Sequence, residues 1–266
     1  MWSYAAQVLY PTQWLRRTGL LPPTPVVGDP PGAVPRPGLG ARFSCSHPHP
    51  VLLEHGTEHD EFVAEFDEMA DVYDAFVRPF STPIFDEALG EIQPLMRPDA
   101  RVLDAGCGAG TELQRIARLL PDGEVVGIDL AAGMVNAAWT SARAHGLANC
   151  AFFQSDVGAL PKVFDGAFDL VYNSLAHHHY PDPAKAAAAI HDALRPGGIY
   201  CVVDPGPAWF NALSGPLAKW ADPGWIGFHS PGQFRELFLA AGFARACWRE
   251  VLPGFGVAIA QKAGTA

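Results

Sequence analysis

The pattern of hydrophobic and polar positions from residue 101 onward shows short apolar runs separated by longer amphipathic stretches. Each run is followed closely by glycine or by a polar residue, which is typical of buried strands in an α/β protein. The runs predict strands at 101–104, 124–129, 150–153, 168–172 and 199–203. The stretches between them predict helices at 111–120, 132–145 and 183–194. Helices of this length between strands favour right-handed crossovers and a parallel sheet.

The pattern changes after the fifth predicted strand, which a turn at 196–198 precedes. Residues 205–229 gather aromatic side chains among glycines and prolines, and a helix is expected at 231–241. Two further apolar runs, 244–251 and 256–261, are separated by a short connection. A connection of that length suits an antiparallel pair of strands.

The first hundred residues differ from the rest. Residues 1–53 hold ten of the 25 prolines and a single acid, which excludes long helices or strands. This arm is interpreted as an extended or disordered segment, with a targeting presequence as the alternative. Residues 54–74 hold nine acids and no lysine or arginine, and an amphipathic helix is predicted from Phe62, Phe66, Met69, Tyr73 and Val77. We therefore expect an arm at 1–53, a helical cap at 54–98, and a catalytic domain at 99–266 with an insertion at about 205–229.

Composition narrows the class of protein. The chain has 266 residues, 49% of them hydrophobic, and no apolar run approaches the ~20 residues that cross a bilayer. A net charge of −10 argues against nucleic acid as a partner, although the acidic cap supplies most of it. The five cysteines are scattered without a CxxC pair, which argues against a bound metal and a disulfide framework. We expect a cytoplasmic protein, with organellar targeting by the arm left open.

A glycine-rich loop after the first predicted strand is the main candidate for binding chemistry. Asp104 is followed by Gly106, Gly108 and Gly110, where glycines let a ligand approach backbone N–H groups at a helix N-terminus. The spacing is G-x-G-x-G, and a carboxylate beside it would repel a pyrophosphate but orient a cationic amino group. The loop therefore favours a cofactor that carries an amino acid over a dinucleotide.

Polar residues also follow the next two strands. Asp129 ends the second strand and can accept both ribose hydroxyls, with a helix N-cap as the alternative role. Met134 can pack on an adenine face or in the core. Ser155 and Asp156 follow the third strand, where Asp156 can accept from the adenine amino group or form a turn.

These motifs resemble, in order and spacing, those of class I S-adenosylmethionine-dependent methyltransferases, especially the ubiquinone and menaquinone biosynthesis type. The resemblance rests on VLDAGCGAG (102–110), GIDLAAGM (127–134), SD (155–156), FDLVYNSLAHH (168–178) and LRPGG (194–198). It implies a Rossmann-like, mostly parallel sheet of seven strands in the order 3-2-1-4-5-7-6, with helices on both faces. It also implies S-adenosylmethionine as cofactor and S-adenosylhomocysteine as product.

The resemblance assigns a cofactor role to residues of each motif. They are Tyr73, Asp104, Gly106, Gly108, Gly110, Asp129, Leu130, Met134, Ser155, Asp156, Val157 and Asn173. Asn173-Ser174 stands at a pair of positions where the family varies freely, so the acceptor chemistry stays open. Residues 1–50 match nothing in the family core.

The acceptor site is expected from aromatic and titratable residues near the predicted methyl position. Trp209, Trp225, Phe228 and His229 could hold a planar or apolar substrate. In the run of three histidines, His177 or His178 is the expected catalytic base, ahead of His179, with a structural role as the alternative. Adjacent histidines seldom converge on one ion, so no metal is expected. Arg78 could bind an anionic group or lie at the surface.

The sequence thus predicts a methyltransferase that acts on oxygen or carbon of a small-molecule acceptor. One alternative is an S-adenosylmethionine-binding protein of the same fold with another role. A nicotinamide-dependent oxidoreductase is a third reading, and the glycine spacing speaks against it. Neither nucleic acid nor a membrane span is expected, and a homodimer is compatible with the sequence.

Overall fold

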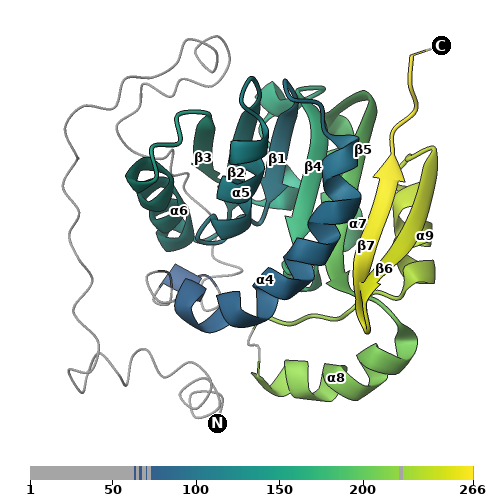
Figure 1. Ribbon diagram of the computed structural model, residues 1–266. Coiled ribbons are helices and arrows are strands. Elements are labelled where there is room, and N and C mark those ends of the chain that lie inside the picture. The colour runs from purple at the N-terminus through teal and green to yellow at the C-terminus, as the bar shows by residue number, and fades with distance from the viewer. Residues whose placement is uncertain (1–62, 64–65, 68–69, 71–72, 222–223, 266) are drawn as a thin grey trace, which may run out of the picture.

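A single twisted sheet organises the chain in the computed structural model, which describes residues 63, 66–67, 70, 73–221 and 224–265 (Figure 1). Its strands are β1 (Arg101–Ala105), β2 (Glu124–Asp129), β3 (Cys150–Gln154), β4 (Phe168–Ser174), β5 (Leu194–Pro205), β6 (Arg245–Leu252) and β7 (Phe255–Gln261). Their order is β3-β2-β1-β4-β5-β7-β6. Strands β1 to β5 pair in parallel, and β7 runs antiparallel to both β5 and β6. The predicted fold class and strand order are confirmed.

Helices cover both faces of the sheet and bury its apolar side chains. Helices α4 (Tyr73–Ile92), α5 (Thr111–Leu119) and α6 (Ala132–Ala144) share a core with one face. Helices α7 (Pro183–Ala193) and α9 (Pro231–Ala240) share a core with the opposite face. Phe85 of α4 and Phe234 of α9 are almost fully buried at these two cores. Burying large side chains on both faces fixes the sheet between two helical layers.

Strand β5 differs from its prediction because it begins five residues early, at Leu194 rather than at residue 199. Leu194 pairs with Phe168, and the register then shifts so that Ile199 pairs with Leu170. The predicted turn 196–198 lies within this irregularity, where Gly197 has a φ of 77°. A bulge of this kind lets the ladder absorb a proline and two glycines without ending the strand.

Two helices were not predicted individually. Helix α4 runs for 20 residues through Pro79 and Pro83, and it begins at Tyr73, within the predicted amphipathic helix whose apolar positions reach Val77. Most of that predicted helix lies outside the described residues. Helix α8 (Ala208–Ala221) occupies much of the insertion that follows β5. Figure 1 shows α8 set apart from the sheet, below the edge where β4 and β5 end.

The carboxyl ends of β1 to β4 meet at one edge of the sheet, because parallel strands all point the same way. Every polar motif found in the sequence follows one of these strands, so the topology brings the motifs together. Within the described ranges, no helix is long and apolar enough to cross a membrane.

Candidate functional site

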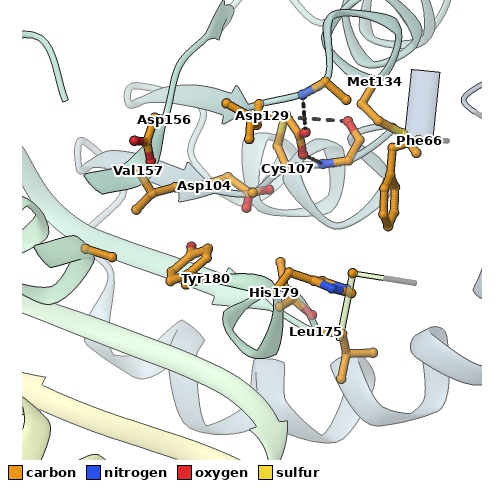
Figure 2. A pocket seen from close by; sticks show the side chains of 18 of the residues that line it. Phe66, Asp104, Cys107, Asp129, Met134, Asp156, Val157, Leu175, His179 and Tyr180 are labelled. Carbon is orange, nitrogen blue, oxygen red and sulfur yellow. Dashed lines mark hydrogen bonds between the residues drawn. The ribbon is translucent and has the colours of Figure 1, made fainter. Parts of the chain in front are cut away.

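A cavity of about 540 Å³ opens at this edge of the sheet (Figure 2). Its lining comes from the loops that follow β1, β2, β3 and β4, from α4 and α6, and from residues 224–226. Such a volume is within the usual range for small-molecule and cofactor sites. Ten of the predicted site residues line it: Asp104, Gly106, Gly108, Asp129, Leu130, Met134, Ser155, Asp156, Val157 and Trp225.

The glycine loop has the backbone conformation that its sequence requires. Gly106, Gly108 and Gly110 have φ angles of 93°, 50° and 81°, a region that side chains with a Cβ rarely adopt. A Cβ on Gly106 would lie 2.9 Å from the Ala176 side chain, and one on Gly110 would lie 2.8 Å from that of Ala138. Gly110 does not line the cavity; it precedes α5 and lets that helix pack closely on α6.

Asp129 is held at the end of β2 by two backbone donors. Its Oδ2 accepts from the Gly108 N–H at 2.9 Å, and its Oδ1 accepts from the Ala131 N–H at 2.9 Å. Burial raises the pKa of this carboxyl, whereas the two N–H donors lower it. The carboxylate is therefore fixed in orientation at the cavity wall, and each oxygen keeps a lone pair for a ligand hydroxyl.

Asp104 is the most deeply buried acid of the cavity, at 2% exposure. Tyr172 Oη donates to its Oδ2. Burial raises the pKa of Asp104 well above its usual value, Tyr172 opposes this, and the nearby Glu112 and Asp129 carboxylates raise it further. A cationic group bound here would relieve this unfavourable electrostatics.

The loop after β3 forms another wall. Asp156 Oδ1 accepts from the Gly158 N–H at 2.7 Å and caps the short helix η4 (Val157–Ala159). Ser155 is buried, and the side chain of Val157 points toward the cavity. Met134 is 1% exposed in a small apolar cluster that includes Phe66, so it packs in the core and lines the cavity at once.

Asn173 lies behind the glycine loop rather than in the cavity lining. Its Nδ2 donates to the Ala105 carbonyl and, at 2.7 Å, to Tyr180 Oη, while Tyr180 Oη donates to the same carbonyl at 2.7 Å. Tyr180 also lines the cavity, although no sequence motif indicated it. The two side chains tie the end of β1 to the segment after β4 and so position the loop.

Leu175 shows a strained backbone at the cavity. Its φ is 52°, and it is the one non-glycine residue with positive φ among the described residues. Its N–H donates to the Val203 carbonyl at 2.8 Å, and its side chain lines the cavity. Strain of this kind persists where the surrounding structure enforces it, often at functional sites.

Residues 66–67, called the cap segment below, lie in close contact with the start of α6 at the edge of the cavity. The Gly133 N–H donates to Asp67 Oδ1 at 2.5 Å, at the start of α6. A Cβ on Gly133 would lie 2.9 Å from both the Asp67 Cα and its carbonyl oxygen. This approach places the adjacent Phe66 in the cavity lining, where it faces His179. Gly133 lies within the GIDLAAGM motif, but the sequence assigned it no role, because that role depends on a residue 66 positions away.

The three adjacent histidines form the short helix η6 (His177–His179) and point in three directions. His179 lines the cavity, with its ring 4.2 Å from that of His178. His178 Nδ1 lies 2.7 Å from Asp204 Oδ1. His177 is 1% exposed against Tyr180, His229 and Phe234, and burial together with the neighbouring histidines lowers its pKa well below the usual value. The two histidines expected as base candidates thus lie outside the cavity lining.

The aromatic residues expected at the acceptor site separate in a similar way. Trp225 lines the cavity, and Phe228 lies behind it, packed on Trp225 and His178. His229 lies beside His177, outside the cavity lining, and burial lowers its pKa. Trp209 of α8 is 58% exposed and is not among the lining residues. Tyr73 begins α4, and its side chain lies outside the described part of the chain.

The residues around the cavity fit S-adenosylmethionine as a ligand. Asp104, whose buried carboxyl has no cationic partner among the residues that the structure describes, suits the ammonium of the methionine portion, and Asp129 suits ribose hydroxyls. The positive-φ glycines leave room for a ligand against the backbone. In the described ranges, no three His, Cys, Asp or Glu side chains are grouped to hold a metal ion.

Comparison with known proteins agrees with this geometry. Residues 96–222 match a protein family described as "Methyltransferase domain". The chain is 35% identical over 159 residues to malonyl-[acyl-carrier protein] O-methyltransferase of Dechloromonas aromatica, covering 59% of this chain and 55% of that one. It is 32% identical over 166 residues to ubiquinone biosynthesis O-methyltransferase of Ruegeria pomeroyi, covering 59% and 64%.

A solved structure shows the same fold. A SAM-dependent methyltransferase from Aquifex aeolicus superposes with a TM-score of 0.57 at 20% identity, covering 75% of this chain and 97% of that one. The chain spans about half the length of the curated relatives it matches.

The fold and the cavity resemble those of methyltransferases that use S-adenosylmethionine. The matched residues 96–222 are just under half of this chain, and the similar proteins include the ubiquinone type expected from the motifs.

Proposed function

We propose that this protein transfers the methyl group of S-adenosylmethionine to an oxygen of a small-molecule acceptor. The observation that carries the proposal is the buried Asp104 carboxylate beside the glycine loop, in one cavity with Asp129. Asp104 would hold the ammonium group, Asp129 the ribose hydroxyls, and Asp156 with Met134 the adenine. When bound, the cofactor supplies the electrophilic methyl group.

The chain's own contribution is alignment and exclusion of water. Tyr180 and Asn173 hold the Ala105 carbonyl and thereby the loop that would carry the cofactor. Phe66, Leu175 and Trp225 give the cavity apolar walls. In-line transfer disperses positive charge, so a closed apolar surround lowers the barrier relative to water.

His179 is the histidine placed to receive a proton from an acceptor hydroxyl, because it alone of the three in η6 lines the cavity. The ring of His178 packs on it, and His178 is oriented by Asp204. We assign His178 and Asp204 a positioning role behind His179. We therefore propose His179 as the base in place of the predicted His177 or His178, because η6 directs the rings of those two residues into the protein.

A carboxylate acceptor is the second candidate. Arg78 lines the cavity from α4 and forms no ion pair or hydrogen bond with the part of the chain that the structure describes. A guanidinium binds a carboxylate through two N–H donors. The malonyl group in the name of the Dechloromonas relative is such an acceptor. A carboxylate is already ionised at neutral pH, so it needs no base.

Binding of S-adenosylhomocysteine tests the cofactor site. We expect Asp129→Ala to weaken its affinity by roughly 10- to 100-fold in calorimetry, because hydrogen bonds to a charged group are lost. The exposed Asp122→Asn, at the opposite end of β2, should bind like the wild type. A thermal unfolding curve confirms that each variant is folded. Unchanged affinity in a folded Asp129→Ala variant would refute the assigned site.

Two further variants separate the acceptor types. Formation of S-adenosylhomocysteine would be followed with panels of phenols and carboxylic acids over pH 6 to 9. For a hydroxyl acceptor, His179→Gln should lower kcat by roughly 100-fold and abolish the pH dependence. For a carboxylate acceptor, Arg78→Gln should raise KM, whereas the exposed Arg235→Gln should not. Turnover equal to that of the wild type in both variants would refute the roles assigned to His179 and Arg78. If the wild type itself turned over no acceptor, a non-methylating role would be favoured.

A further inference from the structure

Helix α8 exposes a continuous apolar stripe to solvent. Trp209, Leu213, Leu217 and Trp220 are 58%, 75%, 63% and 54% exposed. They are spaced by four, four and three residues, so all four lie on one side of the helix. These are large side chains, and a contiguous group of them on a protein surface marks an interaction site.

The opposite side of α8 packs on the protein through Phe210, whose ring lies 5.1 Å from that of Phe255, and otherwise through small and polar residues. Asn211 donates to the Gly206 carbonyl at 3.0 Å, and Ser214 donates to the Phe210 carbonyl at 2.8 Å. Gly215 is buried, and a Cβ there would lie 3.7 Å from the Trp225 ring. A surface helix normally buries its apolar side and exposes its polar side. Helix α8 packs apolar and small residues inward and still exposes a second apolar stripe, so its outer side is suited to an apolar environment.

The size and chemistry of the stripe argue for a lipid surface. Four such side chains present on the order of 500 Å², which is below the ~800 Å² per partner that a stable protein dimer buries. A tryptophan stands near each end of the helix with leucines between, and tryptophan prefers the headgroup level of a bilayer. Helix α8 holds one cation, Lys219, and no acid, although the chain has a net charge of −10.

We propose that α8 docks this protein onto the surface of a phospholipid bilayer, with the helix axis in the plane of the membrane. The stripe inserts its tryptophans and leucines at the boundary of headgroups and acyl chains. Ile226, 53% exposed, and Trp225 line the cavity next to α8, so docking places the cavity mouth close to the bilayer. The proposal does not depend on which acceptor is methylated.

Vesicle flotation with the full chain tests this inference. Vesicles of phosphatidylcholine, with and without 20% phosphatidylglycerol, would be mixed with the protein at 50 and 500 mM salt. We expect binding to both compositions with less than a threefold effect of salt, because insertion of apolar groups rather than charge drives it. Leu213→Ser combined with Leu217→Ser should lower the bound fraction at least tenfold. The matched control is Val163→Ser with Leu239→Ser, two exposed apolar residues away from α8, and it should bind like the wild type.

Each variant is first checked for the wild-type melting temperature and for binding of S-adenosylhomocysteine, since the mutated leucines do not line the cavity. Failure of the wild type to float overturns the proposal, as does flotation of the α8 variant at the wild-type level. Sedimentation that shows a dimer dissolved by the α8 substitutions, without flotation, would assign the stripe to a second copy instead.

Discussion

At the scale of single residues, the site places two acids in surroundings that disfavour their ionised form. Burial raises the pKa of both Asp104 and Asp129, and the Asp129 carboxylate raises that of Asp104 further. The nearby donors are a tyrosine hydroxyl and backbone N–H groups, which carry no full charge. A buried carboxylate without a cation destabilises a fold. The electrostatics of the site are therefore suited to a positively charged ligand.

The variant Asp104→Asn tests whether the charge of this buried carboxylate serves ligand binding. The pKa of Asp104 is higher in the folded than in the unfolded state. The contribution of Asp104 to the free energy of unfolding is therefore fully favourable below about pH 3.9, and it is lost as the pH rises through the folded-state pKa. At pH 7.5 we expect the neutral amide to stabilise the ligand-free protein by roughly 1 kcal/mol. It should also weaken binding of S-adenosylhomocysteine at least tenfold. Thermal unfolding and calorimetry check the two effects, and Asp122→Asn is the control. Lower stability together with unchanged affinity would show that Asp104 has a purely structural role.

The pH dependence of binding is a separate prediction. A bound ammonium group lowers the pKa of Asp104 below its ligand-free value. Affinity for S-adenosylhomocysteine should therefore fall as the pH drops through the ligand-free pKa of Asp104. Calorimetry from pH 5 to 8 measures this, and the Asp104→Asn variant should show a flatter profile. A wild-type affinity that rises toward pH 5 would contradict the assigned role.

The sequence identified the types of residue at the site better than their directions. The glycines and the acids that follow β1, β2 and β3 line the cavity or shape its loop because strand ends fix where they point. The three histidines could not be ordered in this way. Helix η6 turns each ring to a different environment, and the direction of that turn depends on tertiary packing against Asp204 and Phe234.

At the scale of elements, the cap segment is positioned by one glycine of α6. Gly133 allows Asp67 to approach within a distance that a Cβ would prevent. Phe66, next to Asp67, thereby reaches the cavity. The cap and the cofactor loops are thus coupled through backbone contact at the start of α6.

We expect Gly133→Ala to displace the cap and to weaken binding of S-adenosylhomocysteine roughly tenfold. The sheet and its two cores should be little affected, so the melting temperature should stay within a few degrees. Calorimetry and thermal unfolding measure both quantities. The matched control is Gly90→Ala in α4, where a Cβ would meet no atom within 4 Å. Equal affinities for the two alanine variants would show that the cap does not contribute to the site.

Elements were predictable where periodicity was strong. Helices α5, α6, α7 and α9 and all strands but β5 have bounds close to the predicted ones. Helix α8 escaped prediction because its glycine and proline suggested a loop and its apolar residues suggested a lid over the substrate. Their exposure on the outer side depends on how the helix is rotated, which the sequence does not state.

At the scale of the whole molecule, strand order was anticipated through the resemblance of its motifs rather than through periodicity. Apolar runs and crossover helices predict a parallel sheet, but they do not state which strands are neighbours. The cavity depends on that order, because β1 and β4 must be adjacent for Asn173 to reach the Ala105 carbonyl. The acceptor end of the cavity was least predictable, since it combines α4, the cap, η6 and residues 224–226.

The position of β7 between β5 and β6 also constrains the sequence of events in folding. Strand β6 is made before β7, yet its ladder partner in the sheet is β7. It does not pair with β5 directly, so the edge of β5 stays open until β7 has been made, and a β6–β7 hairpin can then dock there as one unit. The free edge of β5 is a place where a nascent chain can pair with the wrong partner. The two-residue connection between β6 and β7 shortens that interval, because hairpins form within microseconds.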